Sequence, residues 1–228
     1  MIKKKLFILI TALIMVSEIS SLEAFHFGMI GAFSMPFYTG SGFEEELQEI
    51  GLEASVDKVI NNPIWGFSLG PTMEYRFHPA FSLESEFLLS AAGGGYVMVE
   101  NGLREVHLFS EINLDLPVLI KYSLALKKNR SLYFMAGPQL SIFLLEAEFV
   151  QDDHVFNKEN NGRDAYYPVG LGILTAFGWQ APLRKMDILM ELRYAREFTN
   201  SIRDIGNNYQ NVISIATGLK FRTGGEDK

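Results

Sequence analysis

The segment from Leu108 to Leu124 alternates between apolar and polar side chains, and it constrains the fold more than any other part of the sequence. A repeat of two residues is that of a β-strand, because a helix would spread the same apolar residues around its whole circumference. At about 3.3 Å per residue the strand is long enough to cross a bilayer at a tilt. Its apolar face comprises Leu108, Ile112, Leu114, Leu116, Val118, Ile120, Tyr122 and Leu124.

The start of the chain indicates where such a strand would fold. Lys3, Lys4 and Lys5 precede an apolar run over residues 6–16, and Ala24 offers the small residue that signal peptidase needs. We expect residues 1–24 to be a signal peptide and residues 25–228 to form one exported domain. The chain has no Cys, which excludes disulfides, thiolate metal sites and an acylated N-terminal cysteine. The formal net charge is −7, and an acidic chain is a poor nucleic-acid binder.

The same alternation recurs along the rest of the mature chain. Eight runs show it, and they cover residues 27–35, 65–77, 81–90, 108–124, 133–144, 169–179, 187–195 and 213–221. In a membrane barrel the apolar face meets lipid and the charged face turns into a narrow interior. The sequence therefore predicts an all-β fold, an eight-stranded antiparallel transmembrane β-barrel with up-and-down connections. A secreted lipocalin-like barrel would need an apolar interior, and the inward charges argue against it.

The connections between the runs also alternate, in length. Long segments follow the first, fifth and seventh runs (37–63, 148–166 and 199–210), and short turns follow the second, fourth and sixth. Asn101 and Gly102 lie between two alternating arms and predict a type I′ hairpin that extends the third and fourth strands beyond the membrane. This asymmetry is typical of an outer-membrane barrel, whose turns face the periplasm and whose loops face outward.

Three prolines conflict with the strand prediction, because a closed barrel has no edge at which a missing N–H is harmless. They are Pro71, Pro117 and Pro138. We expect a β-bulge at each, with conformational freedom from the preceding Gly70 and Gly137.

Aromatic residues near the strand ends predict two girdles at the membrane interfaces, as in known barrels. These residues are Trp65, Tyr75, Tyr122, Tyr167, Phe177 and Trp179. Phe221 ends the last apolar stripe and is expected to act as a signal for the barrel-assembly machinery.

The order of the segments SLESEFLLS, INLDLPVLIKYSL, LYFMAGPQLSIFL, YYPVGLGILTAFG, ILMELRYAREFTNSI and NVISIATGLKF resembles the PorT-like group of bacterial outer-membrane β-barrels. This group is related in architecture to the OmpA membrane domain. The resemblance covers nearly the whole mature chain and implies an eight-stranded barrel with periplasmic termini. It carries over no catalytic residue.

The charged residues of the inward faces define the candidate site. They are Glu74, Arg76, Glu84, Glu86, Glu111, Asp115, Lys121, Asp187, Glu191, Arg193 and Lys220. Eight strands enclose an interior just wide enough for side chains, and buried charges must pair or become neutral. One interpretation is a salt-bridged plug in a membrane scaffold or surface interaction protein. The alternative is a narrow cation-preferring pore, motivated by the excess of acids.

A lipid-modifying enzyme is a third hypothesis, and it would need a nucleophile, a base and an orienting group within hydrogen-bond reach. His107 and Ser110 lie three residues apart on a strand and so point to opposite faces. His26, His78 and His154 show no metal-ligand spacing. We therefore expect no enzyme activity, no catalytic, cofactor or metal site, and no cofactor.

The first long loop is the best candidate for a partner site. Phe43, Leu47, Ile50 and Ile60 recur near helical spacing beside Glu44, Glu45, Glu46 and Glu49, which predicts an amphipathic segment over the barrel mouth. The alternative is a solvated loop that caps its own barrel. The expected partners are outer-membrane lipid, the assembly machinery during biogenesis and an extracellular ligand of the loops, with the protein a monomer and no nucleic acid bound.

Overall fold

The computed structural model describes residues 25–39, 41, 58–61, 65–100, 103–152, 155–159, 168–184, 186–199 and 209–222. Its strands are β1 (Phe25–Thr39), β2 (Lys58–Asn61), β3 (Gly66–His78), β4 (Phe81–Glu86), β5 (Leu88–Glu100), β6 (Leu103–Ala125), β7 (Ser131–Asp152), β8 (Val155–Glu159), β9 (Val169–Leu183), β10 (Met186–Glu197) and β11 (Tyr209–Arg222). A short 3₁₀ helix, η2 (Lys127–Asn129), joins β6 to β7. Within these ranges no helix is long and apolar enough to cross a membrane.

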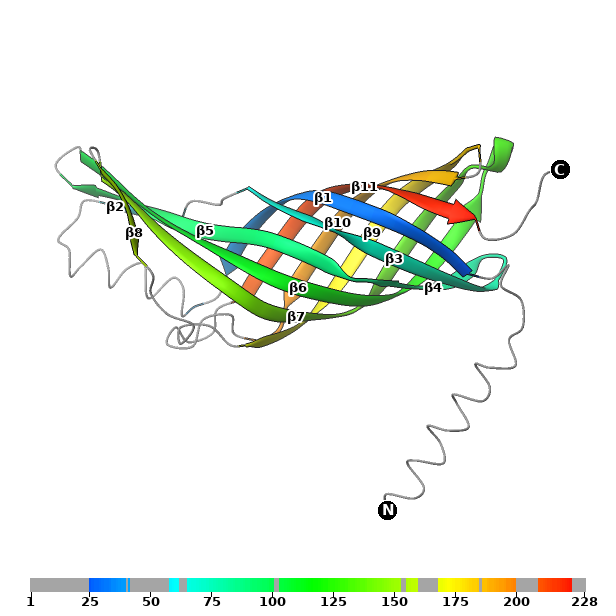
Figure 1. The fold of residues 1–228 in the computed structure, drawn as a ribbon, viewed down its shortest axis with the longest axis horizontal. Helices are drawn as coiled ribbons and strands as arrows, with labels where there is room; N and C mark the ends of the chain where they lie inside the picture. Colours follow the sequence, from blue (N-terminus) through cyan, green and yellow to red (C-terminus); the bar gives the residue numbers. More distant parts are fainter. Residues whose placement is uncertain are drawn as a thin grey trace, which may run out of the picture.

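The strands close into a barrel (Figure 1). β1 pairs on one side with β3 and on the other with β11, from His26↔Arg222 to Thr39↔Tyr209. The remaining ring runs through β4 and β5, β6, β7, β9 and β10, and each neighbouring pair is antiparallel. Counting β4 and β5 as one barrel strand, the described residues form a closed barrel of eight strands, which confirms the predicted fold class.

β4 and β5 form one barrel strand that is interrupted only at Phe87. The register to β3 is the same on both sides of the interruption, with Thr72↔Glu86 before it and Leu69↔Leu89 after it. The N–H of Phe87 donates to the carbonyl of Pro71 at 3.0 Å. Pro71 has no N–H to donate to Phe87. The pair therefore makes one backbone hydrogen bond, where a hydrogen-bonded antiparallel pair normally makes two.

The bulges predicted at the prolines are therefore wrong. The register of β6 with β7 is likewise the same at Pro117↔Gln139 and at Ile120↔Ala136, on the two sides of Pro138. Gly70 and Gly137 contribute space instead of freedom, because a Cβ on Gly70 would overlap the carbonyl oxygen of Phe87 and one on Gly137 that of Val118. The β6–β7 ladder has its irregularity elsewhere, between Ile112 and Asn113.

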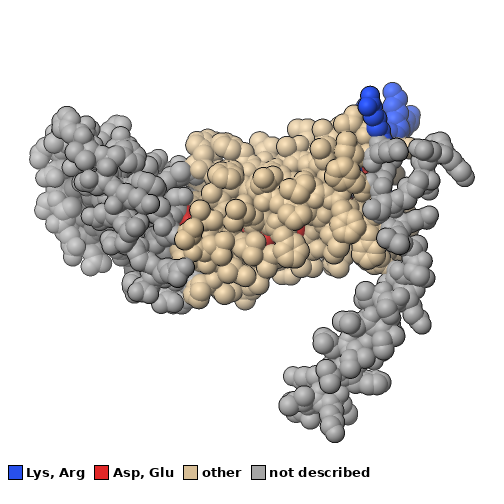
Figure 2. Space-filling model, in the orientation of Figure 1, with Lys and Arg blue, Asp and Glu red and all other residues tan. Residues whose placement is uncertain are grey.

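The two faces of each barrel strand divide as the alternation predicts. Outward residues such as Phe67, Leu89 and Ile215 are more than half exposed, while inward residues such as Lys121 and Glu84 are fully buried. On the face drawn in Figure 2 the described barrel wall is almost entirely uncharged, with Lys and Arg gathered at one end. We call the end with the β3–β4, β6–β7 and β9–β10 connections the turn end, and the opposite end the loop end.

Beyond the loop end, the strands β5, β6 and β7 continue past the barrel as an extended sheet (Figure 1). β5 and β6 pair up to Glu100↔Leu103, which confirms the predicted ribbon and leaves residues 101–102 as its connection. β2 adds to β5 and β8 to β7. Parts of the segments 37–63 and 148–166 that were predicted as loops are therefore strands.

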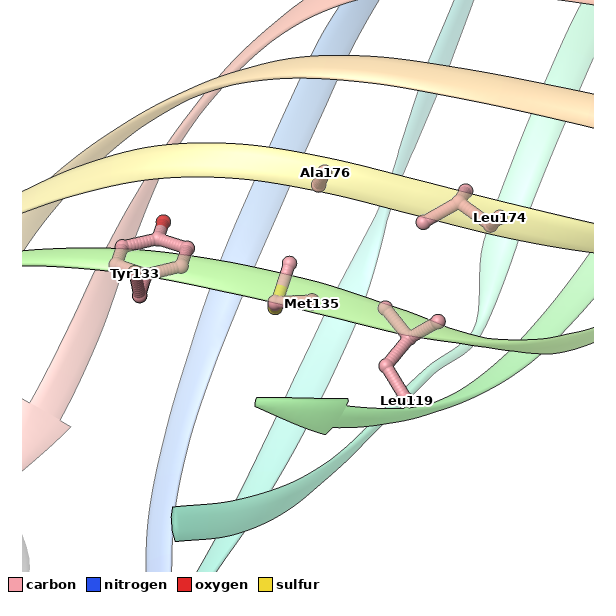
Figure 3. Close-up of a cluster of buried hydrophobic side chains, with 5 residues drawn as sticks. All are labelled: Leu119, Tyr133, Met135, Leu174 and Ala176. Atoms are coloured by element: carbon pink, nitrogen blue, oxygen red, sulfur yellow. The ribbon is translucent and has the colours of Figure 1, made fainter. Parts of the chain in front are cut away.

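The interior also contains apolar side chains. Leu119, Tyr133, Met135, Leu174 and Ala176 pack together on the inner faces of β6, β7 and β9 (Figure 3). A second group, Ile30, Leu88, Leu189 and Ala216, lies on other strands. The polar groups inside the barrel therefore lie beside these two apolar clusters, which limit the access of water to them.

Candidate functional site

The interior charges nearest the turn end form a compact four-membered group, which we call the turn-side layer. Lys220 Nζ lies 2.7 Å from Glu74 Oε2 and 2.6 Å from Glu84 Oε2. Lys121 Nζ lies 3.1 and 3.5 Å from the same two oxygens. The four residues come from β3, β4, β6 and β11, and each side chain is at most 2 % exposed. Two cations and two carboxylates thus bridge the interior as a neutral set.

Neutral groups complete the bonding of the turn-side layer. The hydroxyl of Thr72 donates to Glu84 at 2.9 Å, and Lys121 Nζ lies 4.0 Å from the ring centroid of Tyr133. Gln180 accepts from Lys121 at 3.3 Å and donates to Asp187 Oδ2 at 2.9 Å. Because the charged atoms are held from several directions, the layer is a fixed element rather than a set of mobile side chains.

A second group, the middle layer, lies further from the turn end and centres on Arg193. Its guanidinium donates two parallel bonds to Glu86, at 2.8 and 2.7 Å, and a third from Nε to Glu191 at 2.6 Å. The hydroxyl of Tyr133 donates to the other oxygen of Glu191 at 2.6 Å. The bidentate geometry is the strong form of an Arg–carboxylate pair. The layer holds one cation and two acids.

The remaining interior acids differ from these, because uncharged donors surround them. Glu111 accepts from the hydroxyl of Tyr38 at 2.7 Å and from the amide of Gln210. Asp115 accepts from the hydroxyl of Ser90 at 2.5 Å. Among the described residues neither carboxylate has a cation within ion-pair distance. Tyr38, Glu111 and Gln210 form what we call the loop-side layer.

Two predicted interior residues take positions that differ from the rest. Arg76 lies at the turn end with 46 % of its side chain exposed, 3.8 Å from Glu74 Oε1. The alternation placed it on the inner face, but its closeness to the turn leaves it at the rim, so its assignment to the buried interior is wrong. Asp187 is buried near the same end and bonds to Gln180.

Sequence reasoning missed the uncharged members of these layers. Tyr38, Tyr133, Gln180 and Gln210 all bond to interior charges. The only signal for them in the sequence was a position on the inward face of an alternating segment. For Tyr133 this signal was present in residues 133–144. Spacing within one strand cannot show which distant strand faces it across the interior.

Aromatic side chains lie near both ends of the barrel wall. At the loop end, Trp65 is 64 % exposed and stacks on Phe33 at 4.9 Å. At the turn end, Tyr75 and Tyr122 contact Phe25 and Phe81 at 4.9 and 5.1 Å. In addition, Trp179 lies 5.9 Å from the guanidinium of Arg130. Phe177 lies deeper, level with Phe134 and Leu192, and Tyr167 falls outside the described residues.

The other predicted positions can be placed in part. Phe221 is 49 % exposed and pairs with Phe27 and Met186. His78 Nδ1 accepts from the N–H of Ala80 at 3.2 Å within the β3–β4 turn. The segment 42–57, with most of the amphipathic pattern, and His154 lie outside the described residues. Within the described part of the chain, no three His, Asp or Glu side chains are grouped to hold a metal.

Comparison with solved structures finds outer-membrane barrels of low sequence identity. OprG from Pseudomonas aeruginosa is 14 % identical with a TM-score of 0.45, over 88 % of this chain and 98 % of that chain. Neisserial surface protein A is 14 % identical with a TM-score of 0.41, over 86 and 97 %. Ail of Yersinia pestis, solved with the heparin analogue sucrose octasulfate, is 11 % identical with a TM-score of 0.41, over 86 and 99 %.

A search of curated proteins gives no match. The sequence does match a family of outer-membrane barrels, described as "Outer membrane protein beta-barrel domain", over residues 20–203. This match includes the strands from β1 to β10 and most of the interior charges. The chain therefore belongs to the outer membrane protein beta-barrel domain family.

Proposed function

We propose that this outer-membrane protein is a non-conducting, non-enzymatic scaffold whose barrel is closed by its own side chains. The observation that carries the proposal is the turn-side layer. Lys121 and Lys220 hold Glu74 and Glu84 from four strands, and all four side chains are buried. A permeating ion would have to break these contacts in an interior only wide enough for side chains.

The middle layer supports the same proposal. Arg193 joins Glu86 on β4 to Glu191 on β10, and Tyr133 reaches Glu191 from β7. Two bonded layers in series make a plug that does not depend on any single contact. A fixed plug also braces the wall, so the barrel can carry the extended sheet formed by β2, β5, β6, β7 and β8 outside the membrane.

Single-channel recording of the refolded protein in a planar bilayer tests the plug. We expect no conductance steps from the wild type. The positive control replaces Glu74, Glu84, Lys121 and Lys220 together with Ala, which empties the turn-side layer and removes equal numbers of buried cations and carboxylates. The middle layer still blocks the interior of this variant, so Arg193→Ala and Glu86→Ala are added in a second step. The resulting sixfold variant should conduct. Reproducible conductance by the wild type would reject the plug.

A narrow cation-preferring pore is the second candidate, and the acid excess toward the loop end favours it. Glu111 and Asp115 face the interior without a described cation partner. Under this hypothesis the wild type would conduct, and its reversal potential in a salt gradient would follow the cation. The same recordings therefore separate the two functions.

The surface role rests on the extended sheet, which offers backbone edges and connections at the loop end. We infer that these connections face the cell exterior and that the turn end, where β1 begins and β11 ends, faces the periplasm. We also infer membership of the PorT-like group and a monomeric state. Surface-directed proteolysis of intact cells tests the orientation, since cleavage should fall in the connections at the loop end and spare the turns.

A further inference from the structure

Two connections at the turn end carry a group of exposed cations. Lys127 and Lys128 lie in η2, Arg130 follows it, and Arg184 lies in the β9–β10 connection, and all four side chains are exposed. The two connections are neighbours, because β7 begins directly after Arg130 and pairs with the last part of β9. Figure 2 shows Lys and Arg side chains gathered at this end. We call these four residues the cationic rim.

The acids described toward this end do not neutralise the cationic rim. Glu74, Glu84 and Asp187 are buried inside the barrel. Within the described part of the chain, none of the four rim cations makes an ion pair. Arg130 lies 5.9 Å from the centroid of the Trp179 ring, a contact that leaves its charge in place. The rim therefore presents several positive charges to its surroundings.

Two of the rim cations have a backbone conformation that favours other residue types. Lys128 has a φ of 64° and Arg184 a φ of 56°, in the left-handed region where Gly or Asn fits more easily. Together with Asn129 they are the non-Gly residues with left-handed φ among those described. A Gly at either position would relieve this strain, so the presence of a cation there supports a role for its charge outside the protein.

The barrel wall directly beside the rim is apolar. The outward stripe of β6 ends in Leu124 and Leu126, and Leu183 ends that of β9, and all three side chains are exposed. Trp179 lies on the same outward face of β9, beside Arg130. Trp side chains favour the level of the lipid headgroups, and long cationic side chains reach past this level toward the phosphates. The rim and the wall beside it therefore match the two parts of a phospholipid, its phosphate and its acyl chains.

We propose that the cationic rim binds the headgroups of anionic phospholipids in the leaflet at the turn end. The guanidinium groups of Arg130 and Arg184 suit a phosphate because they donate paired hydrogen bonds, and Lys127 and Lys128 add two point charges. A zwitterionic headgroup carries its own cation, which competes with the rim for the phosphate. Each Lys or Arg near an anionic surface strengthens association by about fivefold. The site lies on the outside of the barrel and does not depend on whether the interior is plugged.

Quenching of Trp179 fluorescence by brominated lipids tests the proposal. The chain has two Trp residues, so Trp65→Phe leaves Trp179 as the reporter. The protein is refolded into vesicles with equal mole fractions of phosphatidylglycerol and phosphatidylcholine, and the acyl chains of one lipid or the other are brominated. Both leaflets contain both lipids, so the orientation of the protein does not affect the result. We expect an association constant for phosphatidylglycerol that exceeds that for phosphatidylcholine by about fivefold or more.

Neutral variants show whether the rim causes this preference. Replacement of Lys127, Lys128, Arg130 and Arg184 together with Gln should remove it. Lys127→Gln with Lys128→Gln, which leaves the Arg130–Trp179 contact intact, should lower it. Arg196→Gln is the matched control, because it removes an exposed cation near the loop end, and it should keep the preference. Gel mobility before and after boiling verifies that each variant is folded.

The other tryptophan tests whether the preference is local. Trp179→Phe leaves Trp65 at the loop end as the reporter, and both lipids should quench it equally. The proposal is overturned if both lipids quench Trp179 equally, if the folded neutral variants keep the preference, or if Trp65 shows the same preference as Trp179. Conductance recordings are independent of all three results.

Discussion

Arg193 on β10 and Glu86 on β4 meet inside the barrel through two parallel hydrogen bonds of 2.8 and 2.7 Å, although 107 residues separate them in the sequence. The pair ties opposite parts of the wall together. Since Glu191 is bonded to the same guanidinium, Arg193 is the one cation that two buried carboxylates share in this layer.

Arg193→Ala should lower the stability of the barrel clearly, because it leaves Glu86 and Glu191 buried without their cation. Breaking a buried pair by removing one partner typically costs about 3 to 5 kcal/mol. Urea unfolding in lipid vesicles, followed by tryptophan fluorescence, measures the change in free energy of unfolding. Lys127→Ala, in the exposed β6–β7 turn, is the control and should change this free energy by less than about 1 kcal/mol. Equal stabilities of the two variants would show that water screens the interior charges.

Gly70→Ala and Gly137→Ala should each impair folding, because the added Cβ would overlap the carbonyl oxygen of Phe87 or Val118. Overpacking of this kind costs about 1 to 3 kcal/mol. Gly31→Ala is the matched control, since the nearest atom to its added Cβ is a Leu69 methyl at 3.4 Å. The fraction of protein that refolds in detergent, read from the mobility of unboiled samples, checks the prediction. Wild-type refolding of Gly70→Ala would contradict the close backbone approach.

Phe221→Asp should reduce insertion into the outer membrane, because it places a charge on the lipid side between Phe27 and Met186. An Arg or Lys on the lipid face costs about 2 to 4 kcal/mol at the bilayer midplane and about 0 to 1 kcal/mol near an interface, and an Asp costs less. Phe221 lies at the turn end, so a clear assembly defect of Phe221→Asp would exceed this thermodynamic cost. Phe221→Leu keeps an apolar side chain and should insert better than the Asp variant. Membrane fractionation of cells that express each form provides the measurement, and equal insertion of all three would remove the assembly role of Phe221.

The wild-type protein should fractionate with the outer membrane and migrate faster on gels when unboiled. The physical reason is the closed ladder between β1 and β11, which leaves no free edge at which detergent could begin to open the barrel. Gel electrophoresis of boiled and unboiled membrane fractions is sufficient. Recovery of unboiled protein in the soluble periplasmic fraction would contradict the membrane assignment.

The alternation of inward and outward side chains made most of the barrel predictable from the sequence. A shift by one residue exchanges the two faces of a strand, so Lys121 and Ile120 had to lie on opposite sides once one face was assigned to lipid. Depth along the barrel axis was harder to predict. Arg76 has inward parity and yet lies at the exposed rim, because parity carries no information about distance from the turn.

The partners within the interior could not be predicted, because they depend on how the strands are staggered around the ring. Nothing local in the sequence links Glu74 to Lys220, which is 146 residues away. The error at the prolines has a related cause. Pro71 and Phe87 fit without a bulge because a neighbouring glycine lets two backbones approach, and that contact exists only in the paired strands.

Lys220 lies on the last strand, and this position has a consequence for the order in which the barrel is built. Glu74 and Glu84 are made early, on β3 and β4, and of the two buried lysines that bridge them only Lys121 is present until β11 arrives with Lys220. A chain truncated before β11 therefore has two carboxylates for one lysine in its unfinished interior, as well as an open edge on β1. The final strand neutralises the centre in the same step that closes the wall, so partly assembled forms are electrostatically unfavourable and the completed ring is selected over them.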